Sequence, residues 1–189
     1  MLRVQHHAKS CDGHQASGWH THHEMPYLTI RDLTEAAEGA IAIGRKYAVR
    51  RRGELFYDAI LFAVLHERHG PIVRQWKLPL LCNQARAKRI DFKERRQRGA
   101  VVEFAVRART GAELSASQNR SELRKLLRAK SARIRILLLL DPSARPALTS
   151  SALRQQYRRL NLGRGRFNRL AVRVVYVRPG FSFHFTWRP

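Results

Sequence analysis

The sequence has few cysteines, few acidic residues and no long apolar run. Its two cysteines, Cys11 and Cys82, lie far apart and do not form a Cys-x-x-Cys pair, which argues against a disulfide framework and against a cysteine zinc site. They indicate free thiols in a reducing compartment. No apolar run is long enough to span a bilayer, and the N-terminus lacks the apolar core of a signal peptide. We therefore expect a cytoplasmic protein, nucleoid-associated if its source is bacterial, that does not contact a membrane.

Acidic residues are scarce beside basic ones. In 189 residues, 37 Lys and Arg against 14 Asp and Glu give a formal net charge of +23. Self-repulsion on this scale works against a compact chain, and a polyanionic partner relieves it. Nucleic acid fits better than a membrane surface, because phosphates reward dispersed Arg and Lys and because no basic amphipathic helix stands out. We expect a nucleic-acid partner.

The basic residues are dense between Arg120 and Arg178, where sixteen Arg and Lys occur with two acids, Glu122 and Asp141. Arg prevails over Lys there, which suits bidentate contacts to phosphate. A merely solvated surface normally mixes both signs of charge. The residues we expect near a nucleic-acid backbone are Arg124, Arg128, Arg154, Arg158, Arg159, Arg164 and Arg166.

The first 28 residues differ from the rest of the chain. Residues 1–24 hold six of the nine histidines among Ser, Gly and Gln, with little periodicity. We interpret residues 1–28 as a disordered His-rich extension, with a weak metal-binding tail as the alternative. Residues 29–189 are long enough, and the chain is apolar enough at 44%, to form a single domain with its own core.

Apolar periodicity divides this domain into helices and strands. Helices are expected at 29–49, 54–68, 120–130 and 149–161, and strands at 72–78, 89–92, 100–107, 133–141, 170–177 and 181–187. The expected N-caps are Thr29 or Asp32, Ser117 or Asn119, and Thr149. The run at 133–141 is apolar on both faces, which predicts a central strand. Residues 66–69 lack the zinc-protease spacing of histidines and are expected at an exposed helix end.

The last strand, at 181–187, alternates strictly, so its aromatic side chains share one face. Such a stripe usually packs in a core, and we expect that here. Base stacking and a dimer surface are the alternatives.

Two carboxylates define the candidate site. The strands at 89–92 and 100–107, joined by the basic turn 93–99, form a hairpin that places Asp91 beside Glu103. Neighbouring carboxylates are costly unless a cation lies between them, and Mg²⁺ and Mn²⁺ prefer oxygen ligands. The alternative is surface ion pairing, of Asp91 with neighbouring basic residues and of Glu103 with Arg107. Glu103 shares a partly apolar face with its strand neighbours, which favours a functional carboxylate.

Glu54 opens the second helix. A carboxylate in a first helical turn suits the helix dipole, which is its ordinary explanation. The alternative is that Glu54 is a third acid directed at Asp91 and Glu103.

The order helix, three strands, helix, buried strand is similar to the core of the PD-(D/E)XK, or restriction-endonuclease-like, nuclease superfamily. The resemblance covers about residues 54–141, with the helix and strands at 149–188 as additions. The matching pieces are Glu54, Ile90-Asp91-Phe92, Val102-Glu103-Phe104-Ala105 and the helix that follows Ser117. The resemblance implies an α/β fold with an αβββαβ core, in which helices flank a mixed central sheet.

In that superfamily the acids hold one or two Mg²⁺ ions that activate water. The resemblance therefore implies a metal-dependent endonuclease that hydrolyses DNA phosphodiester bonds with Mg²⁺ or Mn²⁺. Asp91 and Glu103 are the implied metal ligands, and Glu54 is an auxiliary acid. DNA is favoured over RNA as the partner, and the oligomeric state, a homodimer or a subunit of a nucleoprotein complex, stays open.

The chain departs from the superfamily at the lysine two residues after the glutamate, because position 105 is Ala. One interpretation is that Lys125 on the following helix has taken over the role of this lysine. Lys93 and Arg107 are weaker substitutes, since arginine cannot act as a base. The other interpretation is a catalytically degenerate nuclease-fold protein that binds nucleic acid as a structural or assembly subunit.

Overall fold

The computed structural model describes residues 27–47, 54–70, 72–77, 89–95, 97–107, 111–146, 148–162 and 170–189. The predicted His-rich extension lies outside these ranges except for its last two residues, 27 and 28. Both cysteines and the predicted contact residues Arg164 and Arg166 also lie outside them. None of the helices in the described ranges has the length and apolar character that crossing a membrane requires.

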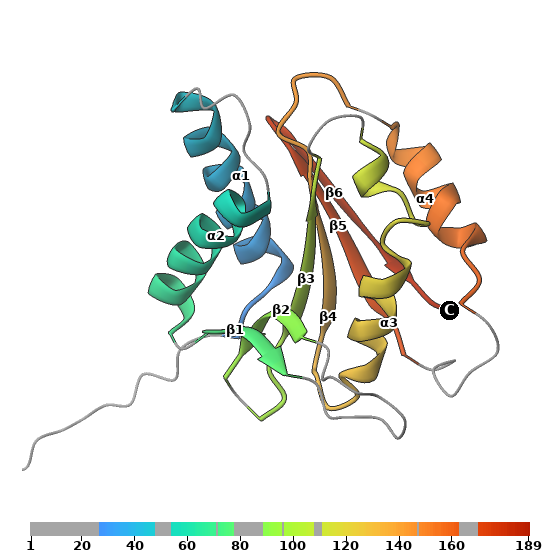
Figure 1. Ribbon diagram of the computed structural model, residues 1–189, viewed down its shortest axis with the longest axis horizontal. Coiled ribbons are helices and arrows are strands. Elements are labelled where there is room, and N and C mark those ends of the chain that lie inside the picture. Colours follow the sequence, from blue (N-terminus) through green and yellow to red (C-terminus); the bar gives the residue numbers. More distant parts are fainter. Residues whose placement is uncertain are drawn as a thin grey trace, which may run out of the picture.

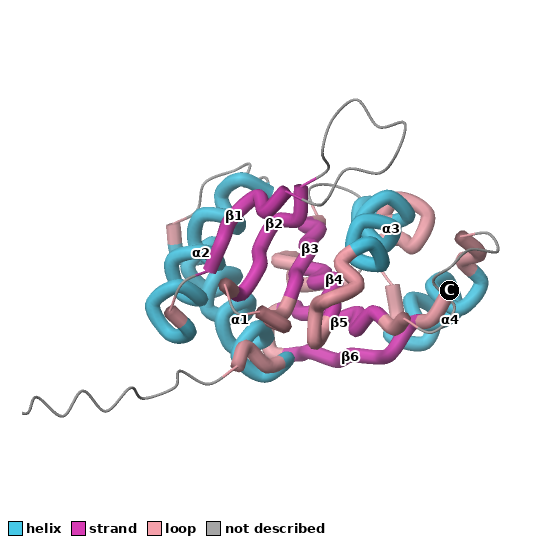
Figure 2. The backbone as a smooth tube through the Cα atoms, turned by 90° about the horizontal axis from the view of Figure 1, so that it is seen from below, coloured by secondary structure: helices cyan, strands magenta, loops and turns pink. Residues whose placement is uncertain are grey.

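A six-stranded mixed sheet forms the centre of the molecule, and its strands lie side by side in the order in which they occur in the chain (Figures 1 and 2). The strands are β1 (Ile72–Lys77), β2 (Arg89–Glu94), β3 (Val101–Val106), β4 (Arg135–Leu140), β5 (Val172–Arg178) and β6 (Phe181–Trp187). The parallel neighbours are β3 with β4 and β4 with β5, and the other pairs are antiparallel. The predicted α/β class with a mixed central sheet is thus confirmed.

Helices cover both faces of the sheet. On one face lie α1 (Ile30–Lys46) and α2 (Glu54–His69), and on the other lie α3 (Arg120–Arg128) and α4 (Ser150–Arg159), with a short 3-10 turn at Ala112–Leu114 before α3 (Figure 1). Each helix pair encloses its own apolar cluster against the sheet. Within the described residues the chain therefore forms three layers, with β1 and β6 as the two edge strands.

The central strand is β4, as its apolar run predicts. Every residue of β4 is buried. Leu138 and Leu140 face the α1/α2 cluster, whereas Leu137 and Leu139 face the α3/α4 cluster. Arg135 is buried too, and its Nη2 donates to the carbonyls of Ala129 and Lys130, just after α3, at 2.8 and 2.7 Å. This strand connects both cores and anchors α3.

Helix caps follow the prediction in two places and depart from it in a third. Thr29 and Thr149 cap α1 and α4, each accepting a hydrogen bond from the amide three residues on. Asn119 is in the N-cap position of α3, but its side chain makes no cap. Its Nδ2 instead donates to the carbonyls of Glu113 and Ser115, so Asn119 occupies the predicted N-cap position without making the capping hydrogen bond. Asn119 fixes the loop that leads into α3.

The predicted basic turn at 93–99 begins too early. β2 continues through Lys93 to Glu94, and Glu94 is only 1% exposed. Its carboxylate accepts hydrogen bonds from the amides of Leu28 (3.3 Å) and Ala100 (3.0 Å). A Cβ atom at Gly99 would lie 2.4 Å from the Glu94 carbonyl oxygen, so the turn requires glycine there. Because its neighbours in the sequence are basic, Glu94 was not predicted to be a buried structural acid.

The predicted exposed helix end at 66–69 is wrong at His69. This residue is 5% exposed, and its Nε2 lies 3.8 Å from a carboxylate oxygen of Asp32 on α1. The contact between α1 and α2 buries the side chain, and the pattern within α2 alone does not reveal it.

Candidate active site

The hairpin of β2 and β3 brings Asp91 and Glu103 together. The two strands pair at Phe92↔Val102 and Lys93↔Val101. At the next position the carboxylate of Asp91 accepts a hydrogen bond from the amide of Phe104, with 3.0 Å between nitrogen and oxygen. Asp91 is 8% exposed and Glu103 is 1% exposed. These are two largely buried carboxylates on neighbouring strands.

Lys125 reaches this pair from α3. Its Nζ lies 2.7 Å from Oε2 of Glu103 and also pairs with Glu122, one turn earlier on the same helix. The apolar stripe of α3, with Leu123, Leu126 and Leu127 buried, turns the helix so that Glu122 and Lys125 face the sheet. The ammonium group therefore lies between two carboxylates from different elements.

A pocket of about 350 Å³ contains these groups. Its lining residues are Glu54, Asp91, Glu103, Phe104, Ala105, Val106, Glu113, Gln118, Asn119, Glu122 and Lys125. Among the described residues, five of the fourteen acids of the chain thus line one cavity, and Lys125 is the one basic residue that lines it. In a chain of net charge +23, this concentration reverses the local sign of charge.

Burial and mutual repulsion set the protonation of the pocket. Burial, the hydrogen bond to Glu122 and the charge of Asp91 raise the pKa of Glu103 to about 11, although Lys125 acts in the opposite direction. Burial also raises the pKa of Asp91, against the lowering effect of the Phe104 amide. Carboxyl groups with raised pKa values favour the protonated form, so protonation as well as the ammonium of Lys125 reduces the negative charge of the pocket.

The pKa of Glu54 is raised by burial and by the charges of Asp91 and Glu122. Burial would raise the pKa of Glu122 as well, but hydrogen bonds with Glu103 and Lys125 lower it below its ordinary value. The pKa of Lys125 is raised: burial opposes this, and the charge of Glu103 and hydrogen bonds to both glutamates outweigh it. Lys125 therefore keeps its proton at neutral pH, and Glu54 belongs to the same electrostatic cluster.

The fit of a divalent cation rests on two observations. Oε1 of Glu103 is buried and has no hydrogen-bond partner among the described residues. The available donors are carboxylate oxygens, which suit Mg²⁺ and Mn²⁺. As they stand, however, the described residues contain no group of three or more His, Cys, Asp or Glu side chains arranged to hold a metal. The ammonium of Lys125 already lies between Glu103 and Glu122.

Two pocket acids, Glu113 and Glu122, were not predicted as site residues. Glu122 was visible in the sequence as the neighbour of Lys125 on one helix face, and this spacing was the signal for it. Glu113 is held by the amide of Gly111, which donates to its Oε2 at 2.9 Å. No local pattern marks Glu113, since the turn before α3 places it.

The weaker lysine substitutes do not line the pocket. Nη1 of Arg107 donates to the carboxylate of Asp141 at 3.2 Å and also to Ser143. Asp141 is fully buried and accepts a further hydrogen bond from the hydroxyl of Tyr176 at 2.7 Å. Burial alone favours protonated Asp141, yet the hydrogen bonds from Ser143 and Tyr176 and the charge of Arg107 hold its pKa below the ordinary value. Arg107 thus belongs to a structural network at the strand ends.

The predicted backbone-contacting arginines lie on the helices that cover the pocket side of the sheet. Arg124 and Arg128 are on α3, and Arg154, Arg158 and Arg159 are on α4. All are exposed except Arg128, which is partly buried. The structure thus places an arginine-rich surface and the acidic pocket on the same side of the sheet.

Neither a protein-family model, nor a curated protein, nor a solved structure matches the chain. The similarity to the restriction-endonuclease-like superfamily stays a prediction from sequence motifs. The evidence for chemistry consists of the acidic pocket, Lys125 and the surrounding arginines.

Proposed function

We propose that the protein is a metal-dependent endonuclease that hydrolyses DNA phosphodiester bonds. The observation that carries this proposal is the pocket in which five of the fourteen acids surround one lysine. The order α2-β1-β2-β3-α3-β4 supports it, because it is the element order of the αβββαβ core that the sequence resemblance implies.

In this proposal Asp91 and Glu103 hold Mg²⁺ or Mn²⁺, with Glu54 and Glu122 close enough to contribute. The chemistry that a divalent cation held by these residues would supply is activation of a water molecule and neutralisation of charge on the phosphate. To bind a cation, Glu103 has to lose the proton that its raised pKa favours, and its carboxylate then acts as a ligand. The pocket residues thus supply oxygen ligands for the cation in a surrounding of low dielectric constant.

Lys125 takes the position that the missing motif lysine leaves open. Ala105 lines the pocket without a functional group, and the ammonium of Lys125 enters the same cavity from α3. Because its pKa is raised, Lys125 stays protonated. It therefore stabilises negative charge on the phosphate and orients it, whereas a base would have to release the proton.

The arginines of α3 and α4 bind the backbone on either side of the cut. Arg124 lies on the same helix as Glu122 and Lys125 but is exposed, whereas those two line the pocket. A phosphate chain that contacts Arg124 thus lies beside the pocket mouth. Such contacts weaken steeply with salt, because each phosphate neutralised releases counterions.

A second function is favoured by one observation. Lys125 already pairs with Glu103 and Glu122, and the described residues hold no ready three-ligand metal group. A degenerate nuclease fold that binds nucleic acid as a structural or assembly subunit would keep such a neutralised pocket and the same arginines.

Cleavage of single- and double-stranded DNA in Mg²⁺ and Mn²⁺ distinguishes the two functions. The variant is Glu103→Gln, and the matched control is Glu38→Gln, which makes the same substitution at an exposed position of α1. Metal-dependent cutting by the wild type and by the control, lost in Glu103→Gln, supports the nuclease. Salt-sensitive binding without cutting in either metal overturns it and favours the structural subunit.

A further inference from the structure

The second edge strand, β6, carries a row of partly exposed phenylalanines. Phe181, Phe183 and Phe185 point to the α3/α4 side of the sheet, since they pair with Arg178, Tyr176 and Val174 of β5. Phe181 is 41% exposed, and the other two rings are half-buried.

The rings lie close to one another along the strand. The ring centroids of Phe181 and Phe183 are 5.8 Å apart, and those of Phe183 and Phe185 are 6.2 Å apart at an angle of 17°. The stripe was predicted to pack in the core. That prediction is confirmed for Trp187, which is 2% exposed, and it is wrong for Phe181, which is exposed.

Guanidinium groups cover these rings where a core would supply apolar side chains. Arg154 of α4 lies 5.5 Å from the centroid of Phe183 and 5.9 Å from that of Phe185. Arg178 lies 5.0 Å from the centroid of Phe181. Arginine over an aromatic ring is a favourable but partly solvated contact, and it leaves the guanidinium edge available for an anion.

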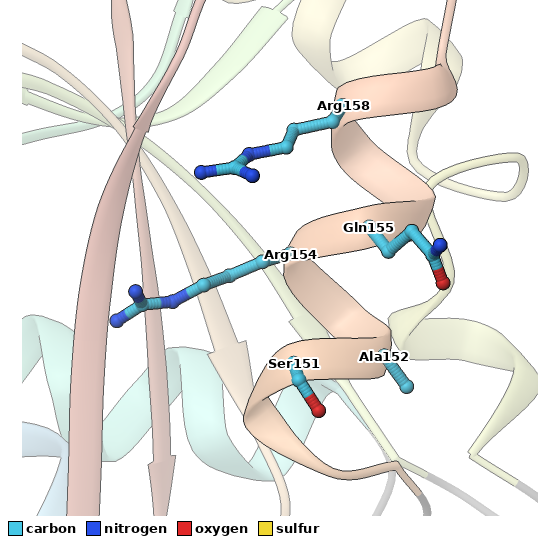
Figure 3. A pocket seen from close by; sticks show the side chains of 5 residues that line it. All are labelled: Ser151, Ala152, Arg154, Gln155 and Arg158. Atoms are coloured by element: carbon cyan, nitrogen blue, oxygen red, sulfur yellow. The ribbon is translucent and has the colours of Figure 1, made fainter.

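A pocket of about 520 Å³ lies beside this row, lined by Ser151, Ala152, Arg154, Gln155 and Arg158 of α4. Figure 3 shows Arg154 and Arg158 extending from the helix in the same direction, toward the C-terminal strands. The two guanidiniums therefore form one side of a hollow next to the aromatic row.

The surrounding sequence contains no acid to compete for these arginines. Residues 142–189 contain ten arginines and no Asp, Glu or Lys. The charge of this surface thus selects an anionic partner. It also disfavours pairing of two β6 edges from two copies of the chain, because each copy would bring Arg154, Arg158 and Arg178 to the interface.

We propose that this surface, made of Phe181, Phe183, Phe185, Arg154, Arg158 and Arg178, binds single-stranded nucleic acid. Unpaired bases stack on the phenylalanine rings when Arg154 and Arg178 turn away from the rings to contact the phosphates. A duplex is a poorer ligand, because its bases are stacked on one another and cannot reach the rings. This proposal does not depend on catalysis in the acidic pocket.

The test is fluorescence anisotropy with labelled oligonucleotides of about 15 residues in EDTA and about 150 mM salt. The probes are oligo-dT, oligo-U and a duplex of mixed sequence, and DNA and RNA single strands distinguish the two sources of unpaired bases. We expect both or one of the single strands to bind more tightly than the duplex. Phe181→Ala is expected to weaken single-strand binding about 5- to 100-fold.

The matched control is Tyr27→Ala. Tyr27 is 47% exposed and also lies under a guanidinium, that of Arg133 at 4.7 Å, but it is remote in sequence from β6. We expect Tyr27→Ala to bind single strands as the wild type does. Phe181→Leu keeps an apolar side chain but removes the ring. If this variant binds single strands more weakly and has an unchanged melting temperature, the loss is due to stacking and not to a folding defect.

Arg154→Gln should reduce the salt dependence of single-strand binding by about one ion. Equal affinity for single strands and duplex, with no effect of Phe181→Ala, overturns the proposal. So does a dimer in sedimentation that Phe181→Ala dissociates, because a second copy then occupies the surface. Single-strand binding without any cleavage supports this inference and contradicts the nuclease, so the two fail separately.

Discussion

Replacing Glu103 with glutamine should stabilise the metal-free protein, although it removes the central residue of the pocket. Glu103 is 1% exposed and neighbours Asp91 and Glu122. Folding places a carboxyl group there that resists ionisation, whereas in the unfolded chain it ionises freely. Glutamine has nearly the same shape and is neutral in both states, so the variant escapes this cost.

The magnitude follows from the shift. The pKa of Glu103 rises from 4.5 to about 11, so the folded protein keeps a proton that the unfolded chain loses above pH 4.5. Stability then falls by about 1.4 kcal/mol for each pH unit, or about 4 kcal/mol by about pH 7.5. Glutamine is a weaker hydrogen-bond partner than a carboxylate for the ammonium of Lys125, which offsets part of this gain. We expect Glu103→Gln to gain about 2 kcal/mol, which raises the melting temperature by about 4–8 °C in a chain of this size.

The assay is thermal unfolding in EDTA across a pH series. The difference between Glu103→Gln and the wild type should be largest at neutral and alkaline pH and should vanish as the pH falls toward 4.5, where both states bind the proton. Glu38→Gln, at an exposed position, should show no such dependence. A Glu103→Gln protein that is less stable at every pH, or a difference that does not shrink on acidification, would refute the electrostatic reasoning.

Three further results are expected. Mn²⁺ should raise the melting temperature of the wild type in the same scan and leave that of Glu103→Gln unchanged, since ligand binding stabilises only the protein that can bind. Lys125→Met vacates the place between Glu103 and Glu122, so calorimetry should show tighter Mn²⁺ binding together with slower DNA cleavage; weaker binding contradicts this. Asp141→Asn should cost about 2–4 kcal/mol in urea unfolding near neutral pH, because the partners of a fully buried charge are left unpaired. Its pKa is lowered, so the wild-type advantage exists above the unfolded pKa and is lost as pH falls through the folded one.

The sheet could be largely predicted because its signals are local. The apolar run before Asp141 is buried on both faces as β4, and the hairpin around Gly99 sets Asp91 beside Glu103. Strand alternation also separated Glu103 from Phe104 correctly, since Phe104 belongs to the α1/α2 cluster. The spacing of apolar residues, the turn residues and the β-branched side chains determine structure over a few residues, so these signals can be recognised in the sequence.

The rest depended on how the layers pack. Glu94 occurs among basic residues and looks like part of a loop, but two backbone amides from separate segments bind it in the interior. The sequence places Glu122 on the same helix face as Lys125, but only the packing of α3 over β3 directs that face into the pocket. The exposure of Phe181 likewise follows from α4 covering one end of β6 and not the other. Such tertiary effects leave no periodic trace in the sequence.

The distribution of charge connects the acidic pocket to the arginine surfaces. A chain of +23 attracts a polyanion at long range and repels a divalent cation, so the cation needs a place where the local sign is reversed. In the proposed nuclease the five pocket acids would supply that reversal, and Lys125 neutralises part of it before a cation binds. A bound phosphate chain lowers the surrounding positive potential and offers the ammonium of Lys125 a new anionic partner. Nucleic acid and the divalent cation should therefore enter the pocket cooperatively, each reducing the electrostatic cost of the other.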